Sequence, residues 1–408
     1  MTRSTSLESL PNEIIYSIFN NVSSRQLWTE VRLLDKRLYS FIVSREYWLR
    51  RFKDKHDIIV RPEIKRNKEL RELLRINIEV EEIKSRFDEN DCLTDYLSCT
   101  GHIGTPDAFH TRRINNRRIL FTGARDHKVA IWDLQNAVEN KNLQKGIKAQ
   151  IHEAHSGWIW DINSSDQYNF YTSSWDGSVK LWRYGSSAVM EDRFKSEQAF
   201  LKLACFNSCV AASNYSGKVS ILDFKTSEKK VAEIDTKNFQ ITNKKKSPAI
   251  EVHYDNQHGG LIVGSENGHI YVFDPRNLSQ PKFTKKIENL RTLTFNAGQL
   301  AACSSKKCFL LDPSNLNIEL DFSQETNTVP FKCIPTYGGY FCADSFDIKI
   351  FTAGLNPRKI TQATFSHRIN NLMYGVGSDL IAGLGEGSIQ LWPRDQIFLG
   401  RVNDMNDL

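Results

Sequence analysis

The sequence predicts an α+β protein with two unlike parts, an all-α N-terminal region followed by an all-β region made of seven repeats. Three observations predict this fold class. Residues 7–52 carry apolar side chains at helical spacing, and residues 53–92 combine alternating charges with a narrow apolar stripe. From Trp132 to Trp392, a short motif then returns about every 40 residues, which is the mark of a repeat architecture.

Composition excludes several classes of protein. The chain has 408 residues, 40% apolar, and a formal net charge of +6, which is mild for this length and does not indicate a nucleic-acid binder. We find no apolar run of about 18 residues and no secretory signal at the start, so we expect neither a membrane partner nor export. The eight cysteines lack the paired spacing of a zinc site and predict reduced thiols in the cytoplasm or the nucleus. We expect no metal and no cofactor.

The first fifty residues predict packed helices. Ile14, Ile15, Ile18, Phe19 and Val22 form one apolar stripe, and Pro11 suits the first turn of a helix. The segment "NNVSSRQL" interrupts this helix, and a second apolar set follows it: Leu27, Val31, Leu34, Leu38, Tyr39, Phe41, Trp48 and Leu49.

Residues 53–92 predict a long amphipathic helix, because Leu70, Leu73, Leu74 and Ile78 face one way and charges face the other. Such a helix is either a stiff connector between the two parts or a solvated helix packed under the second part.

The repeat consists of a turn and a short strand that ends in an aromatic or leucine anchor. The copies "TGARDHKVAIWD" and "TSSWDGSVKLW" place Asp126 and Asp176 six residues before Trp132 and Trp182. Turns such as Asp176-Gly177 between two apolar runs predict β-hairpins, which cannot bury both faces unless neighbouring units pack in a ring. The anchors lie 38 to 51 residues apart: Trp132, Trp182, Leu222, Phe273, Leu311, Phe351 and Trp392.

These residues resemble the WD-repeat family, and the resemblance implies a seven-bladed β-propeller over residues 93–408. In that family a His, a Ser or Thr, an Asp and a Trp form a buried hydrogen-bonded chain within a blade. The corresponding residues here are His155, Thr172, Asp176 and Trp182 in the second blade and His102, Thr122, Asp126 and Trp132 in the first. We expect these residues to be structural, and we assign no catalytic residue.

The sequence leaves the closure of the ring undecided, and it predicts that two insertions lie at the surface. Either the stretch 93–99 or "IFLGRV" near the C-terminus can supply the last outer strand. The insertions "NAVENKNLQKGIKAQ" and "KTSEKKVAEIDTKNFQITNKKKS" are expected to be solvated loops.

Residues 7–52 resemble an F-box, with Asp35 as a departure because the family more often has a Cys or a small residue there. The resemblance implies that this region binds a Skp-type adaptor and, through it, a cullin scaffold, with buried contacts made by apolar side chains. The implied adaptor-binding residues are Leu10, Pro11, Ile14, Ile15, Ile18, Leu27 and Leu34. The alternative is a helical hairpin that only caps the propeller.

The blade geometry of the family implies that three positions in each blade point to the top face. They are the third and the fifth residue after the His that begins the blade, and the residue directly before the Asp of the turn. In the second blade these are Trp158, Trp160 and Trp175, which either bind a partner or pack between blades. The same frame predicts basic residues near that face: Arg125, Lys202, Arg291, Lys332 and Arg368. We therefore expect the face to bind a protein segment, acidic or phosphorylated, through charge-assisted hydrogen bonds.

The sequence thus resembles F-box/WD-repeat proteins along nearly its whole length, which implies a non-catalytic substrate receptor of an SCF-type ubiquitin ligase. One alternative is a non-degradative interaction scaffold. A hydrolase is the third hypothesis, but the sequence offers no converging catalytic residues that the structural chain does not already use.

Overall fold

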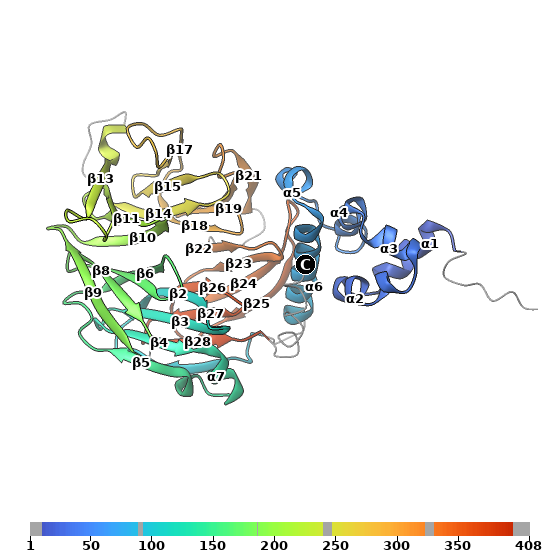
Figure 1. The fold of residues 1–408 in the computed structure, drawn as a ribbon, viewed down its shortest axis with the longest axis horizontal. Coiled ribbons are helices and arrows are strands. Elements are labelled where there is room, and N and C mark those ends of the chain that lie inside the picture. Colours follow the sequence, from blue (N-terminus) through green and yellow to red (C-terminus); the bar gives the residue numbers. More distant parts are fainter. Residues whose placement is uncertain (1–9, 89–92, 186, 240–246, 323–329, 395–408) are drawn as a thin grey trace, which may run out of the picture.

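The computed structural model describes residues 10–88, 93–185, 187–239, 247–322 and 330–394. A cluster of helices lies on one side of a ring of β-sheets, and helix α6 stands between them (Figure 1). The fold class predicted from the sequence, an α N-terminal region and a β-propeller, is confirmed.

The N-terminal helices begin at residues that cap them. Ser23 and Ser44 accept hydrogen bonds from backbone N–H groups of the first turns that follow them. Asp35, the residue that departs from the F-box pattern, accepts bonds from the N–H groups of Arg37 and Leu38 and so begins the next helix. The elements are α1 (Asn12–Asn20), α2 (Ser24–Thr29), η2 (Val31–Leu33), α3 (Lys36–Ile42) and α4 (Arg45–Asp54).

Two helices, not one, follow in the predicted connector: α5 (Pro62–Asn67) and α6 (Leu70–Phe87). Pro62 occupies the first turn of α5, and Glu69 and Glu72 form a capping box that starts α6. The break arises because Lys68 adopts an extended backbone conformation between the two helices.

Helix α6 belongs to both hydrophobic cores. Its residues up to Val80, including Ile76, pack with the N-terminal helices. Its C-terminal half packs with the propeller through Ile83 and Phe87, whose ring meets that of Phe341 edge-on at 5.9 Å. The helix is therefore a shared wall between the two parts.

The propeller consists of seven four-stranded antiparallel sheets. Every anchor of the sequence repeat lies on the third strand of its sheet, which explains the regular spacing. The first three blades are β2 (Pro106–Ile114), β3 (Arg117–Ala124), β4 (Val129–Asp133) and β5 (Ile147–Ile151); β6 (Ile159–Ser164), β7 (Asn169–Ser174), β8 (Ser178–Tyr184) and β9 (Ala188–Lys195); β10 (Phe200–Phe206), β11 (Cys209–Asn214), β12 (Lys218–Leu222) and β13 (Lys230–Asp235). The next three are β14 (Ala249–Asp255), β15 (Gly260–Ser265), β16 (His269–Phe273) and β17 (Phe283–Lys286); β18 (Leu290–Asn296), β19 (Gln299–Ser304), β20 (Cys308–Leu311) and β21 (Ile318–Asp321); β22 (Lys332–Pro335), β23 (Gly339–Ala343), β24 (Asp347–Thr352) and β25 (Lys359–Thr364).

The seventh blade decides how the ring closes. It combines β26 (Ile369–Tyr374), β27 (Leu380–Leu384) and β28 (Ser388–Trp392) with β1 (Leu97–Thr100), which pairs antiparallel with β28. Trp392 donates its indole N–H to the carbonyl of Leu93 at 3.0 Å, which holds the stretch before β1 in place. The competing candidate, "IFLGRV", lies outside the described residues.

The prediction for the first insertion was wrong. Residues 134–151 form α7 (Leu134–Glu139), a 3-10 turn η3 (Leu143–Gly146) and β5 rather than a solvated loop. Leu134, Ala137 and Leu143 are buried against Trp132, so these apolar side chains order the segment. In the second insertion, the described part contains β13 and the 3-10 turn η4 (Thr236–Phe239), and residues 240–246 lie outside the described residues.

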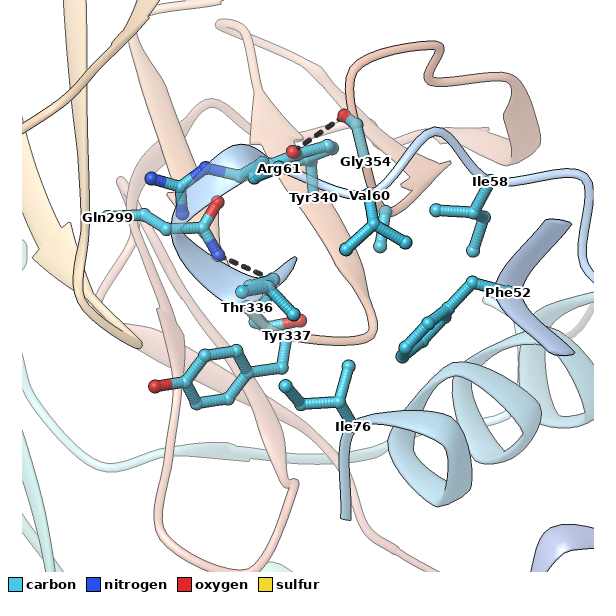
Figure 2. Close-up of a pocket in the computed structure, with 12 residues that line it drawn as sticks. Phe52, Ile58, Val60, Arg61, Ile76, Gln299, Thr336, Tyr337, Tyr340 and Gly354 are labelled. Carbon is cyan, nitrogen blue, oxygen red and sulfur yellow. Dashed lines mark hydrogen bonds between the residues drawn. The ribbon is translucent and has the colours of Figure 1, made fainter. Parts of the chain in front are cut away.

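The segment before α5 packs at the interface between the helical part and the propeller, which we call the joint. Figure 2 shows Phe52, Ile58 and Ile76 of the helical part facing Thr336, Tyr337 and Tyr340 of the sixth blade. They line a cavity of about 20 Å³, room for a single water molecule and far too small for a cofactor or substrate. Arg61, almost fully buried here, pairs with Glu319 of the fifth blade at 2.7 Å. The joint is therefore a packed interface and not a ligand site.

Candidate functional site

The second blade contains a buried chain of hydrogen bonds. His155 contacts Asp176 through Nδ1 at 3.0 Å and Thr172 through Nε2 at 2.6 Å, and Trp182 donates its indole N–H to the Thr172 hydroxyl at 2.9 Å. Because the Thr172 hydroxyl oxygen accepts the indole N–H of Trp182, the Thr172 O–H can donate to Nε2 of His155. The ring proton of His155 then lies on Nδ1 and is donated to Asp176. The imidazole is then neutral.

The first blade repeats this arrangement with His102, Thr122, Asp126 and Trp132. Their contacts are 3.1 Å between His102 and Asp126, 2.8 Å between His102 and Thr122, and 2.9 Å between Trp132 and Thr122. Burial alone would raise the pKa of Asp126, but the hydrogen bond from His102 and those from two backbone N–H groups lower it to about 2. Each polar side-chain atom of these two hydrogen-bonded sets has a hydrogen-bond partner inside its blade, so neither set presents a free group to a substrate.

The top face can now be defined from the structure as the end of the blades that carries the turns between second and third strands. The segments that lead into the innermost strands lie at the same end, because a backbone bond joins each turn to such a segment. Examples are Trp175 N–H to Trp158 O and Tyr215 N–H to Ala199 O. The helical part contacts the opposite end, where Ile83 and Glu79 of α6 meet the turn at Gly338. The top face is therefore not covered by the helices.

Four aromatic side chains gather on this face, and we call Trp158, Trp160, Trp175 and Tyr215 the aromatic strip. Trp175 lies at its centre, with ring centroids 6.1 Å from Trp158, 5.8 Å from Trp160 and 5.3 Å from Tyr215. Trp158, Trp175 and Tyr215 are exposed, and Trp160 is partly buried. Tyr215 was not identified from the sequence, although its position before Ser216-Gly217 matches that of Trp175 before Asp176-Gly177.

The predicted basic residues do not form one patch. Arg125 lies over the Trp158 ring at 4.8 Å and pairs with Asp107 at 2.7 Å. Arg291, the second residue of β18, and Arg368, directly before β26, are exposed.

Lys202 and Lys332 lie near the start of the innermost strands β10 and β22, at the end of the blades that carries the top face. They line a central channel of about 190 Å³ that is formed by the innermost strands. Lys202 pairs with Asp161 at 3.5 Å, and Lys332 donates to Asn371 Oδ1 at 2.6 Å. Burial and the neighbouring charge of Lys202 lower the pKa of Lys332 to about 8.

The candidate adaptor residues divide between the surface and the core. Ile14 and Ile18 are 47% and 38% exposed, one helical turn apart on the same side of α1. Ile15 and Leu27 are fully buried in the core of the N-terminal helices. Their proposed contact with a partner is therefore a wrong prediction, because reaching them would open that core.

The remaining candidates, Leu10, Pro11 and Leu34, differ in their exposure. Pro11 is exposed, Leu34 is 72% exposed, and Leu10 is partly buried against the helical core. Arg37 of α3 donates to Leu10 O and Asn12 Oδ1, which brings the start of α1 beside α3. The exposed Leu33 and Tyr39 near α3 were not singled out as adaptor-binding residues, since spacing alone does not separate an exposed apolar residue from a core one. We call Pro11, Ile14, Ile18, Leu33, Leu34 and Tyr39 the apolar helix surface.

Two further classes of site are absent from the described ranges. These contain no group of three or more His, Cys, Asp or Glu side chains arranged to hold a metal ion. No helix among them combines the length and apolar character needed to cross a bilayer.

Comparisons with known proteins agree with this architecture. The model of the WD domain, G-beta repeat, matches residues 146–183, which run from β5 of the first blade into β8, the third strand of the second blade. A chain in a crystal structure of the mitotic checkpoint complex superimposes with a TM-score of 0.57 at 12% identity, covering 70% of this chain and 89% of that one. The chain therefore has the fold of a seven-bladed β-propeller, with a match to the WD-repeat model within it.

The relatives extend the similarity beyond the propeller. F-box/WD repeat-containing protein mec-15 of Caenorhabditis elegans is 25% identical over 78% of this chain and 78% of its own length. F-box/WD repeat-containing protein 9 of Homo sapiens is 24% identical over 77% of this chain and 67% of its own length. The chain is a homologue of the F-box/WD-repeat proteins.

Proposed function

We propose that this protein is the substrate receptor of an SCF-type ubiquitin ligase, with no catalytic residues of its own. The apolar helix surface would bind a Skp-type adaptor and, through it, a cullin scaffold. The top face of the propeller would bind the protein to be ubiquitylated. The observation that carries the proposal is that two exposed candidate surfaces lie at opposite ends of one packed body.

Chemistry at each surface supports this division of roles. Exposed apolar side chains such as Ile14 and Ile18 on a short helix suit a helix-in-groove interface, where a partner removes them from water. The aromatic strip suits a binding hot spot, since Trp and Tyr are enriched where interface energy concentrates.

The packed region between the two surfaces would hold them at a fixed distance from each other. Helix α6 packs in both cores, so the top face would stand at a set distance from the adaptor. A receptor of this kind raises the effective concentration of a substrate lysine near the ubiquitin-charged enzyme, and it needs no catalytic group to do so.

The test is a pull-down of the full-length protein with a purified Skp-type adaptor. Ile14→Asp with Ile18→Asp should reduce recovered adaptor at least about tenfold, because two charges would enter an apolar interface. Val189→Asp with Val231→Asp, at exposed apolar positions on outer strands of the propeller, is the matched control and should leave recovery unchanged. Equal adaptor recovery by both variants, or none by the wild type, would contradict the proposal.

A further inference from the structure

We propose that the aromatic strip binds a proline-rich segment in the extended polyproline II conformation. This inference rests on the proposed function and deepens it, because it names the chemical class of segment that the top face accepts. It also replaces the acidic or phosphorylated segment that the sequence predicted.

The first argument is the shape of the strip. From Arg125 over Trp158, the side chains continue through Trp175 to Tyr215 and so cross three neighbouring blades. Neighbouring rings are 5.3 to 6.1 Å apart, and a polyproline II helix advances about 3.1 Å per residue, so alternate residues of such a segment match the ring spacing. Aromatic-lined grooves are the surfaces on which proline-rich segments dock.

The second argument concerns hydrogen bonding. Within the described part of the chain, no hydrogen bond uses the indole N–H of Trp158, Trp160 or Trp175, whereas Trp48, Trp132, Trp182 and Trp392 all donate theirs. Polyproline II leaves every backbone carbonyl of the segment without an internal donor. The indoles of the strip therefore offer both an apolar face and a donor to a segment that needs both.

The third argument concerns charge. An acidic or phosphorylated segment needs cations that are free to form charge-assisted bonds. Three of the five predicted cations are already engaged: Arg125 with Asp107, Lys202 with Asp161, and Lys332 with Asn371. Glu251, within 3.5 Å of His253 near the channel, adds a further carboxylate there. Arg125, the cation that contacts the strip, is thus already paired with a carboxylate, which favours an uncharged segment.

The experiment measures binding of two labelled peptides of about twelve residues to the full-length protein by fluorescence anisotropy. One peptide repeats Pro-Pro-Leu, and the other contains glutamate, serine and phosphoserine. The proline-rich peptide should bind in the micromolar range, and Trp175→Ala should weaken it at least about tenfold, as expected for a hot-spot aromatic residue. Tyr215→Ala, on the next blade, should weaken it too and guards against misfolding of one variant.

The matched control is Met190→Ala, because Met190 is 44% exposed and lies in the same blade as Trp175, which is 43% exposed, but on the outer strand. It should change the affinity less than about twofold. Tighter binding of the phosphorylated peptide, with loss in Arg291→Ala or Arg368→Ala, would overturn the inference. No measurable binding of the proline-rich peptide, or binding that Trp175→Ala leaves intact, would overturn it as well. If the adaptor is still recovered in either case, the inference has failed while the proposed function stands.

Discussion

Glu81 of α6 holds together the helices that carry the apolar helix surface, and its charge is open to a direct test. Its carboxylate accepts the backbone N–H of Ser24 at 2.7 Å and pairs with Arg51 and Lys55, each at 2.9 Å. Burial alone would raise the pKa of Glu81, but these donors lower it, so the group is ionised at neutral pH. The Arg51 side chain is fully buried, and Glu81 is its carboxylate partner.

Glu81→Gln keeps the shape of the side chain and removes its charge, which leaves the buried guanidinium of Arg51 uncompensated. Breaking a buried ion pair in this way costs about 3–5 kcal/mol. Because Arg51 retains bonds to Phe19 O and Tyr47 Oη, we expect the lower end, about 3 kcal/mol. With a urea dependence of about 2–3 kcal/mol per molar, the midpoint for loss of helical circular dichroism should fall by about 1–1.5 M.

Asp54→Asn is the matched control, since Asp54 pairs with Arg50 at 2.7 Å on the surface of α4. It should move the midpoint by less than about 0.3 M, because water screens exposed pairs. The double variant Arg51→Met with Glu81→Met should lose less stability than Glu81→Met alone, because no charge is then left buried without a partner. Equal effects of Glu81→Gln and Asp54→Asn would refute the reasoning.

Three further predictions concern the blades and the joint. Thr172→Val should lower the free energy of unfolding by about 2–4 kcal/mol in denaturant, because Trp182 and His155 both lose their hydrogen-bond partner. Thr284→Val on the exposed outer strand β17 is the control and should change it little. Equal losses in the two variants would contradict the role of the buried hydrogen-bonded chain. Burial lowers the pKa of His56 to about 4, below the value near 6.5 of the unfolded chain, so stability is lost as pH falls below 6.5. At pH 5 the loss is about 2 kcal/mol, and His56→Phe should remove that part of the pH dependence in melts at pH 7 and 5; an unchanged slope would refute it. Gly268→Ala places a Cβ against Ile287 O at a φ of 93° and should lower the melting temperature more than Gly259→Ala, where φ is 65° and the space is open. The reverse order would contradict this explanation.

Much of the architecture was predictable because it depends on the spacing of residues that are close together in the sequence. The interval of about 40 residues identified seven units, and each anchor lies on a third strand because the turn before it sets the register of the hairpin. The residues of the hydrogen-bonded chains were also predictable, since the Thr and the Trp lie at the same distance from the turn Asp in both blades. Capping residues such as Ser23 and Asp35 act within one turn, so the helix starts that they set are local features as well.

Other features depend on contacts between residues far apart in the chain, and only the tertiary structure decided them. The apolar stripe of α1 contains both Ile14 and Ile15, but burial of Ile15 beneath the neighbouring helices leaves Ile14 to the surface. Lys202 was predicted near the top face, but only the structure shows that it pairs with Asp161 on the neighbouring blade and lines the channel. Ring closure was undetermined for the same reason, since only the pairing of β1 with β28, almost 300 residues apart, selects one candidate strand. Spacing along a chain specifies which side chains share a face, whereas burial and pairing depend on which distant surface covers that face.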